Sequence, residues 1–231
     1  MRTKSTITPL LFLPGGAYVV GMPVLLLWLS SDWRWVQGWI FYASFAILFG
    51  ACMLWLYLRD PALLAERIRR PGTGGQSRSD LAILLGIKVG TIAWLVLPAL
   101  DRRFGWTPRL APWIETCGSI LLGVGYVFFF RSITGNTFLS QLVRIQSDRG
   151  QHVVSTGVYG FVRHPMYLGA SLMFVGGSLL LGSVPGLITG LGLVLLLAVR
   201  ILGEEKLLLN GLEGYRAYRE KVRYRLIPGV W

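Results

Sequence analysis

Long stretches without a charged side chain recur along this chain. No Asp, Glu, Lys or Arg lies between Lys4 and Asp32, or between Arg34 and Arg59. Lipid offers no hydrogen-bond partner to an exposed backbone, so a stretch of about 20 apolar residues crosses a bilayer as a helix. The hydrophobic content of 53% is also typical of membrane proteins. These features predict an all-α, polytopic transmembrane helical bundle.

About six spans account for the apolar runs. Four are predicted near 9–30, 36–58, 81–100 and 111–130. The next uncharged stretch, 164–199, is too long for one crossing. Its turn signal Gly-Ser-Val-Pro-Gly at 182–186 predicts a tight helical hairpin. One long, tilted helix is the alternative to that hairpin.

The distribution of charge orients these spans. The chain has 23 Lys and Arg residues against 11 Asp and Glu residues. With six spans, most of the basic residues share one side, which holds the N-terminus, 59–80, 131–163 and the C-terminal tail. The positive-inside rule then predicts that both termini are cytoplasmic. A single tilted helix would put the basic tail outside, so the hairpin is preferred. The net charge of +12 therefore indicates topology and attraction to anionic membrane lipid, and no nucleic-acid partner.

Three residues inside the apolar runs need an explanation. Cys52 and Cys117 lack metal-ligand spacing, so we expect packing roles and no metal site. Lys88 is the one charge deep within a predicted span, where it either reaches the interface or faces a polar interior. A small channel or transporter lined by Lys88 is the alternative function from another class. No internal repeat favours a transporter, and the polar residues gather at one membrane face rather than at mid-depth.

Polar side chains are concentrated on both flanks of the predicted hairpin. If its arms pack antiparallel, Arg163 and His164 come close to Arg200 and the Glu204-Glu205 pair. Proline suits the first turn of a helix, so His164 and Pro165 predict a helix start whose free N–H groups can meet a carboxylate. Arg200 and Glu204 are four residues apart and share a helical face. These two side chains either bind two different ligands or pair with each other. A third alternative for Arg200 is that it only extends toward the lipid headgroups, as arginines at a membrane interface often do.

Several ordered blocks in the C-terminal part of the chain resemble one family. They are QHVVSTGVY at 151–159, RHPMYLG at 163–169, EE at 204–205, YRAY at 215–218 and VRYRLIP at 222–228. In this order and with these spacings they resemble the isoprenylcysteine carboxyl methyltransferases and the related phospholipid methyltransferases. NTF at 136–138 and VRIQ at 143–146 are similar to bacterial members. The resemblance covers about residues 131–231, and the first three spans match only in being hydrophobic.

The resemblance implies a pocket for S-adenosyl-L-methionine. It assigns to that cofactor Gln146, Gln151, His152, Val153, Val154, Tyr159, His164, Pro165, Met166, Tyr167 and Glu204. It places Arg200 against the methyl acceptor. Arg163, and Glu205 as a base toward an amine acceptor, complete the predicted catalytic set. The loop between Gln146 and Gln151 is shorter than in eukaryotic members, which leaves Gln146 less securely assigned than Tyr159 or His164.

The predicted function is that of an integral membrane carboxyl O-methyltransferase dependent on S-adenosyl-L-methionine. It would act on a carboxylate, or a similar nucleophile, of a lipophilic acceptor that enters from the bilayer. A phospholipid N-methyltransferase is the alternative within the same chemistry. The chain divides into a four-span region, 1–130, and a catalytic region, 131–231, which includes the hairpin 164–202 and the tail. The bacterial blocks predict the bacterial inner membrane, and no obligate protein partner is evident.

Overall fold

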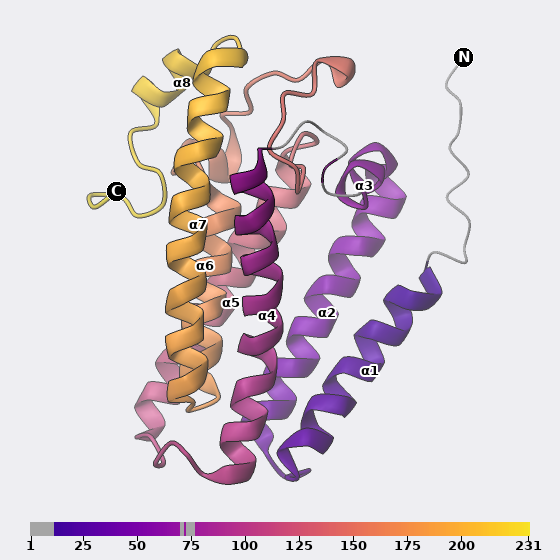
Figure 1. Ribbon diagram of the computed structural model, residues 1–231, viewed down its shortest axis with the longest axis vertical. Coiled ribbons are helices and arrows are strands. Elements are labelled where there is room, and N and C mark those ends of the chain that lie inside the picture. The colour runs from indigo at the N-terminus through magenta and orange to yellow at the C-terminus, as the bar shows by residue number, and fades with distance from the viewer. Residues whose placement is uncertain (1–11, 70–71, 73–76) are drawn as a thin grey trace.

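The computed structural model describes residues 12–69, 72 and 77–231 and is a bundle of long helices (Figure 1). The elements are α1 (Phe12–Ser30), α2 (Val36–Arg59), α3 (Pro61–Arg67), α4 (Arg78–Phe104), α5 (Pro112–Gly135), η2 (Ser147–Arg149), η3 (Gly157–Gly160), α6 (Pro165–Leu180), α7 (Val184–Gly211) and α8 (Tyr215–Lys221). Each long helix coincides with a predicted span. Within the described residues there is no strand, which confirms the all-α fold class.

Four helices, α2, α4, α5 and α7, are long and apolar enough to cross a membrane. The apolar helix α6 has 16 residues, a length of about 24 Å against a hydrocarbon core of about 30 Å. Of the span predicted at 9–30, residues 9–11 lie outside the described residues. The polytopic character of the chain is therefore confirmed, whereas the count of six spans stays a prediction.

The connections divide between the two ends of the bundle. The short α3, the loops between α5 and α6, and α8 gather at one end, which we call the site end (Figure 1). The turns at 31–35, 105–111 and 181–183 lie at the opposite end. This grouping agrees with the grouping predicted from the basic residues. Which end faces the cytoplasm stays a prediction.

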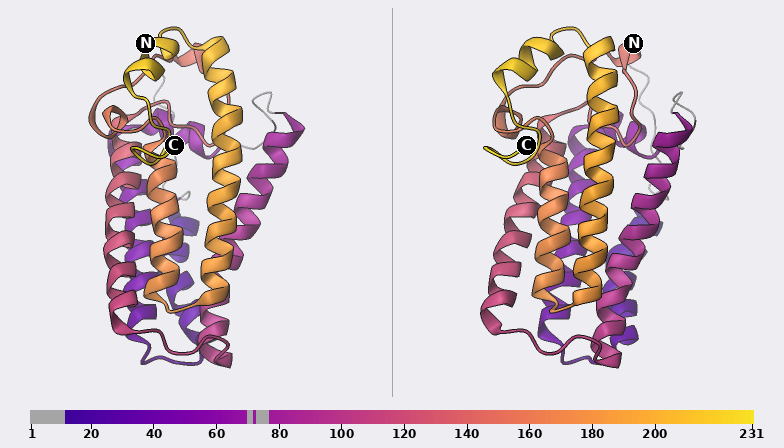
Figure 2. Two further views of the ribbon diagram at one scale, coloured as in Figure 1. Left: turned by 90° about the vertical axis from the view of Figure 1, so that its left-hand side faces the viewer. Right: turned by 60° about the vertical axis from the view of Figure 1, so that its left-hand side comes forward.

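The predicted hairpin is formed by α6 and α7, which run antiparallel (Figure 2). Gly182 makes the turn with φ 63°, a left-handed conformation that glycine adopts without steric cost. The Ser183 hydroxyl accepts a hydrogen bond from the Gly186 N–H (3.1 Å) and so caps α7. α7 continues beyond the predicted hairpin end at residue 202, so Glu204 and Glu205 lie within a continuous helix.

The closest helix pair in the bundle is α5 with α6, which makes the most extensive contacts of any two elements (Figure 2). A side-chain Cβ at Gly125 would lie 2.8 Å from the Gly169 carbonyl oxygen, and one at Gly176 would lie 2.8 Å from the Gly118 carbonyl oxygen. Small residues let helix backbones approach this closely inside a membrane, where van der Waals packing drives association. The 130/131 domain boundary stays a prediction, although it falls within α5 and not between elements.

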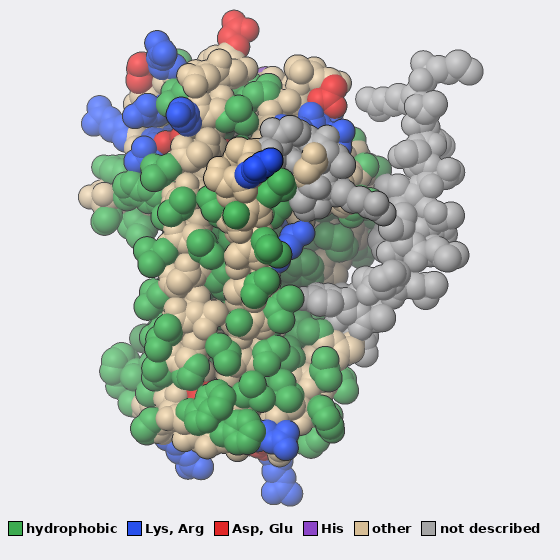
Figure 3. Space-filling view, in the orientation of Figure 1, with side chains coloured by type: hydrophobic (Ala, Val, Ile, Leu, Met, Phe, Trp, Pro, Cys, Tyr) green, Lys and Arg blue, Asp and Glu red, His purple; other side chains and the backbone are tan. Residues whose placement is uncertain are grey.

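On the face drawn in Figure 3, apolar side chains cover most of the middle of the bundle, and basic side chains lie mainly toward its two ends. Trp28, Trp106 and Trp113 are exposed near the end opposite the site, where aromatic residues often mark a membrane interface. This surface suits lipid and not water. Cys52 is buried as expected, but the packing role expected for Cys117 is wrong because Cys117 is exposed. Lys88 is also exposed, and it forms no ion pair with any described residue.

The glycine contacts predict which substitution damages the bundle. Gly125→Ala places a methyl group against the α6 backbone, so we expect the free energy of unfolding to fall by about 1–3 kcal/mol, as overpacking does. Gly123→Ala is the matched control, because nothing lies within 4 Å of a Cβ at that position of the same helix. We expect the control to be neutral or slightly stabilising. Thermal unfolding in detergent measures both, and equal melting temperatures would contradict the packing assignment.

Candidate active site

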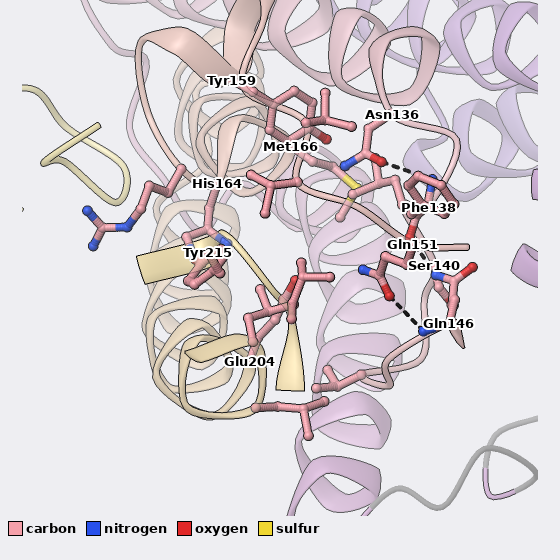
Figure 4. A pocket seen from close by; sticks show the side chains of 18 of the residues that line it. Asn136, Phe138, Ser140, Gln146, Gln151, Tyr159, His164, Met166, Glu204 and Tyr215 are labelled. Atoms are coloured by element: carbon pink, nitrogen blue, oxygen red, sulfur yellow. Dashed lines mark hydrogen bonds between the residues drawn. The ribbon is translucent and has the colours of Figure 1, made fainter. Parts of the chain in front are cut away.

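A cavity of about 830 Å³, measured out to its open mouth, lies at the site end (Figure 4). Its walls come from three parts of the chain: residues 136–159, the start of α6, and the end of α7 with the tail helix α8. Apolar side chains and a few polar groups line this space together, as in small-molecule sites. We call this space the site cavity.

All eleven residues that the resemblance assigned to a cofactor line the site cavity. They are Gln146, Gln151, His152, Val153, Val154, Tyr159, His164, Pro165, Met166, Tyr167 and Glu204. Of the three residues predicted to be catalytic, Arg163 lines the cavity, whereas Arg200 and Glu205 do not. The structure thus brings twelve of the fourteen predicted residues to one place.

The start of α6 forms one wall of the cavity. Pro165 occupies the first helical position, as predicted, and follows the N-cap His164. The His164 N–H donates to the Arg225 carbonyl oxygen (3.0 Å), and so that donor is already used. The next N–H groups, of Met166 and Tyr167, belong to the first turn and have no partner within the helix. These groups are the ones that could meet a carboxylate.

Glu205 lies at the centre of a buried ion network beside the cavity. Its carboxylate accepts hydrogen bonds from Arg163 Nε (2.6 Å) and Arg225 Nε (2.8 Å), and it lies 3.3 Å from His164 Nε2. The side chains of Arg163 and Glu205 are only 3% and 4% exposed. Arg163 also donates to the carbonyl oxygens of Val222 (2.8 Å) and Arg223 (2.6 Å), which holds the tail against the start of α6.

This network bears on two predicted roles. Glu205 is occupied by two guanidinium groups and lies outside the cavity, so the geometry argues against its use as a base toward an amine. Arg163 donates from Nε and Nη1 to Glu205 and to tail carbonyls, which gives it a positioning role, while its predicted catalytic role stays a prediction. Sequence spacing predicted that the two residues lie close together, but it did not identify their partners.

Arg200 and Glu204 share a face of α7 but do not pair with each other. Glu204 accepts a hydrogen bond from the Tyr167 hydroxyl (2.8 Å) and faces the cavity. Arg200 lies 3.4 Å from the carboxylate of Asp80 at the start of α4, and it donates to the Gln141 carbonyl oxygen. The charge of Arg200 is therefore already balanced by an acidic residue that sequence reasoning had not connected to the site.

The two predicted glutamines hold the loop that forms the opposite wall (Figure 4). The Gln146 amide donates to the Phe138 carbonyl oxygen (2.6 Å) and accepts from Arg149 Nη1 (2.5 Å). The Gln146 N–H donates to Gln151 Oε1 (2.6 Å), the contact drawn in the close-up. Gln146 is therefore occupied on both sides of its amide, and its main contribution is to the shape of the loop.

An ion pair between distant elements docks this loop on the bundle. Arg144 donates from Nε and Nη2 to the two carboxylate oxygens of Glu66 on α3, each at 2.8 Å. Such bidentate pairs are strong and fix orientation. The hydrogen bonds from Arg144 hold the pKa of Glu66 below its usual value despite the burial of that carboxyl. No local signal in the sequence indicates this pair, because α3 and the loop are far apart along the chain.

Several cavity residues were not predicted. They include Asn136, Phe138, Leu139, Ser140, Leu142, Val143, Arg144, Leu207, Leu208, Leu212, Tyr215 and Tyr218. Tyr215 is 4% exposed, and its hydroxyl is buried without a hydrogen-bond partner among the described residues. Unsatisfied buried polar groups are rare in proteins, so this hydroxyl at the cavity wall needs a partner from outside the described residues. The YRAY block that contains Tyr215 and Tyr218 was the available signal, although it carried no assigned role.

Comparisons with known proteins agree with this geometry. Residues 114–212 match the family model of the phospholipid methyltransferases, a stretch that includes all of α6 and α7 and every residue of the site cavity except Tyr215 and Tyr218. The chain is a membrane methyltransferase. The fold is similar to that of a eukaryotic intramembrane Ras methyltransferase, an isoprenylcysteine carboxyl methyltransferase. That likeness has a TM-score of 0.61 and 17% sequence identity, and it covers 94% of this chain and 75% of the other. No curated protein matches in sequence.

The comparisons confirm the resemblance drawn from the sequence blocks. The structural likeness covers 94% of the chain and so includes the N-terminal helices. In the sequence, those helices resembled the family only in being hydrophobic. The family match indicates a methyltransferase, and the structural likeness with the apolar helices supports a multi-pass membrane fold. The cofactor, the acceptor and the role of each cavity residue are separate questions.

The buried network predicts losses of stability of unequal size for two adjacent glutamates. Glu205→Gln leaves Arg163 and Arg225 without their anionic partner, so we expect the free energy of unfolding to fall by about 3–5 kcal/mol. Glu204→Gln removes one partner of Tyr167 at the cavity surface, and we expect a loss of about 1 kcal/mol or less. Thermal unfolding of the purified variants measures both effects. A loss for Glu205→Gln no larger than that for Glu204→Gln would contradict the central position of Glu205.

Proposed function

We propose that this methyltransferase uses S-adenosyl-L-methionine to methylate a carboxylate on a lipophilic acceptor. The observation that carries the proposal is the gathering of eleven residues from separate sequence blocks around one cavity. Those blocks were assigned to this cofactor by resemblance alone. Their convergence is the arrangement that a shared ligand requires.

The chemistry of the cavity wall fits this cofactor. S-adenosyl-L-methionine carries an ammonium group, a carboxylate and an adenine ring, besides its charged sulfur. Glu204 offers a carboxylate with one hydrogen bond from Tyr167, and would hold the ammonium group. The first-turn N–H groups of α6 would hold the carboxylate. The rest of the cofactor would face the unpartnered Tyr215 hydroxyl and the leucines at 207 and 208.

The protein contributes position and exclusion of water rather than acid or base catalysis. Bound S-adenosyl-L-methionine would supply a methyl group on a positively charged sulfur, which an anionic oxygen attacks in line. Holding the two partners in line lowers the entropic part of the barrier. A carboxylate oxygen is already ionised and needs no base, in agreement with the engagement of Glu205 in its ion network.

The acceptor reaches the cavity from the bilayer in this proposal, with its apolar tail in lipid and its head at the site end. The partners are then the lipophilic acceptor and membrane lipid, without an obligate protein partner. We infer that the site end faces the cytoplasm of a bacterial cell, as the basic residues predict. Arg200 would orient the acceptor from behind the cavity wall while Asp80 holds it in place.

A second candidate is methylation of a phospholipid amine, which the description of the matching family favours. Turnover of bacterial membranes with methyl-labelled cofactor separates the two candidates. Label in base-labile esters supports a carboxylate acceptor, whereas label in lipid headgroup amines overturns it. Mass spectrometry of the labelled lipid extract then identifies the tail.

Loss of the Glu204 carboxylate tests the cofactor site. Glu204→Ala removes a charge-assisted hydrogen bond, so we expect the affinity for S-adenosyl-L-methionine to fall roughly 10- to 100-fold. Glu213→Ala is the matched control because Glu213 is exposed and does not line the cavity. Isothermal titration calorimetry on the folded proteins in detergent measures both affinities. Equal affinities of Glu204→Ala and the wild type would remove Glu204 from the site.

A further inference from the structure

Arg67, the last residue of α3, is a cation at the site end without an acidic partner. Its Nη1 donates to the Leu139 carbonyl oxygen (3.0 Å). Its Nε is buried and has no hydrogen-bond partner among the described residues. One backbone carbonyl is therefore the only hydrogen-bond acceptor that the described chain provides for a guanidinium with five donor hydrogens.

Three other arginines near the cavity have acidic partners. Arg144 pairs with Glu66, Arg163 with Glu205, and Arg200 with Asp80. All 11 acidic residues of the chain lie in its described part, and none of them has an oxygen within 4.0 Å of an Arg67 nitrogen. The lack of an acidic partner for Arg67 therefore does not depend on the undescribed segments.

Arg67 is half-buried, and its Nε is fully buried without a partner among the described residues. A buried donor of a charged group is unfavourable without an acceptor, and arginine does not escape the cost by losing its proton. Burial lowers the pKa of Arg67. A protein that keeps such a group without a partner of its own provides a place for an anion from outside the chain.

The surroundings of Arg67 place that anion beside the site cavity. Leu139, the residue that accepts its hydrogen bond, lines the cavity. Arg67 therefore lies next to Leu139, on the α3 side of the cavity wall. Glu204 and α8 contribute other parts of the same wall.

We propose that Arg67 binds the anionic oxygen group of the methyl acceptor, a carboxylate or a phosphate attached to an apolar tail. This rests on the proposed function, because it assigns a further residue to the same site. The free fork of Nε and Nη2 matches the two oxygens of either group. Arg200, whose charge Asp80 already balances, then has no need to be the primary anion contact.

The proposal predicts a preference for anionic heads that can be measured without the cofactor. The probes are dodecanoate, dodecyl phosphate and dodecanol, which share one tail, bound to the full chain in neutral phosphatidylcholine nanodiscs and corrected against empty discs. We expect the wild type to bind one anionic probe at least about tenfold more tightly than the alcohol. Preference for dodecanoate indicates an acceptor carboxylate, and preference for dodecyl phosphate indicates a phospholipid phosphate.

Arg67→Met removes the charge and keeps much of the side-chain length. We expect it to lose the anionic preference while its melting temperature without ligand stays equal to the wild type or rises, because the uncompensated charge is gone. Arg67→Lys, which keeps the charge but not the fork, should retain part of the preference. Arg69→Met is the matched control, since Arg69 lies two residues away, is largely exposed and pairs with Glu66.

Two results would overturn the proposal. The first is a wild type that binds all three probes alike. The second is an Arg67→Met variant that keeps the anionic preference. If that variant also loses affinity for S-adenosyl-L-methionine, Arg67 is assigned to the carboxylate of the cofactor instead. Failure of the wild type to bind S-adenosyl-L-methionine would instead refute the proposed function, and the probe measurements would remain interpretable.

Discussion

The site cavity depends on one buried carboxylate, that of Glu205. It joins the end of α7 to Arg163 at the entry to α6 and to Arg225 in the tail. Antiparallel packing of the hairpin would bring the first two segments together without this contact. Hairpin packing does not by itself bring the tail to the start of α6. The hydrogen bonds from Arg163 hold the tail there, and α8 then closes the cavity with Tyr215 and Tyr218. Each member of the network would be an uncompensated buried charge without the others, so the three segments assemble together.

The fold was largely readable from the sequence because the bilayer imposes one simple rule. Uncharged runs of sufficient length must be helices, and the turn at Gly182 and the proline at 165 mark two of their ends. The uncharged runs did not predict how far a helix continues beyond the lipid. α7 extends past residue 202, and that extension carries the glutamates on which the site depends. Similarly, the exposed Cys117 shows that an apolar run alone does not tell a lipid-facing residue from a packed one.

The site was predictable where neighbours in sequence are neighbours in space, and not elsewhere. Arg200 and Glu204 do share a face of α7, as their spacing predicted. Their partners, Asp80 on α4 and Tyr167 on α6, come from other helices. The same holds for Glu66 with Arg144. These pairs depend on the order in which helices pack around one another, which spacing within one helix does not contain. For this reason the sequence suggested catalytic roles for Arg163 and Glu205, whereas in the structure the two side chains pair with each other and join separate segments.

Packing deep in the bundle also determines the geometry of the site. Gly125 and Gly169 allow α5 and α6 to approach at backbone contact, and both helices end or begin at the cavity. The Tyr159 hydroxyl donates to the Ser132 carbonyl oxygen of α5 (3.3 Å), and the Tyr218 hydroxyl donates to the Tyr159 carbonyl oxygen (2.8 Å). The tail, the loop and the bundle are thus linked in series. Because the series starts from a glycine contact that cannot widen without loss of packing, the cavity has a fixed position relative to the apolar surface. A fixed position is what a site needs if the head of an acceptor must meet it while the tail stays in lipid.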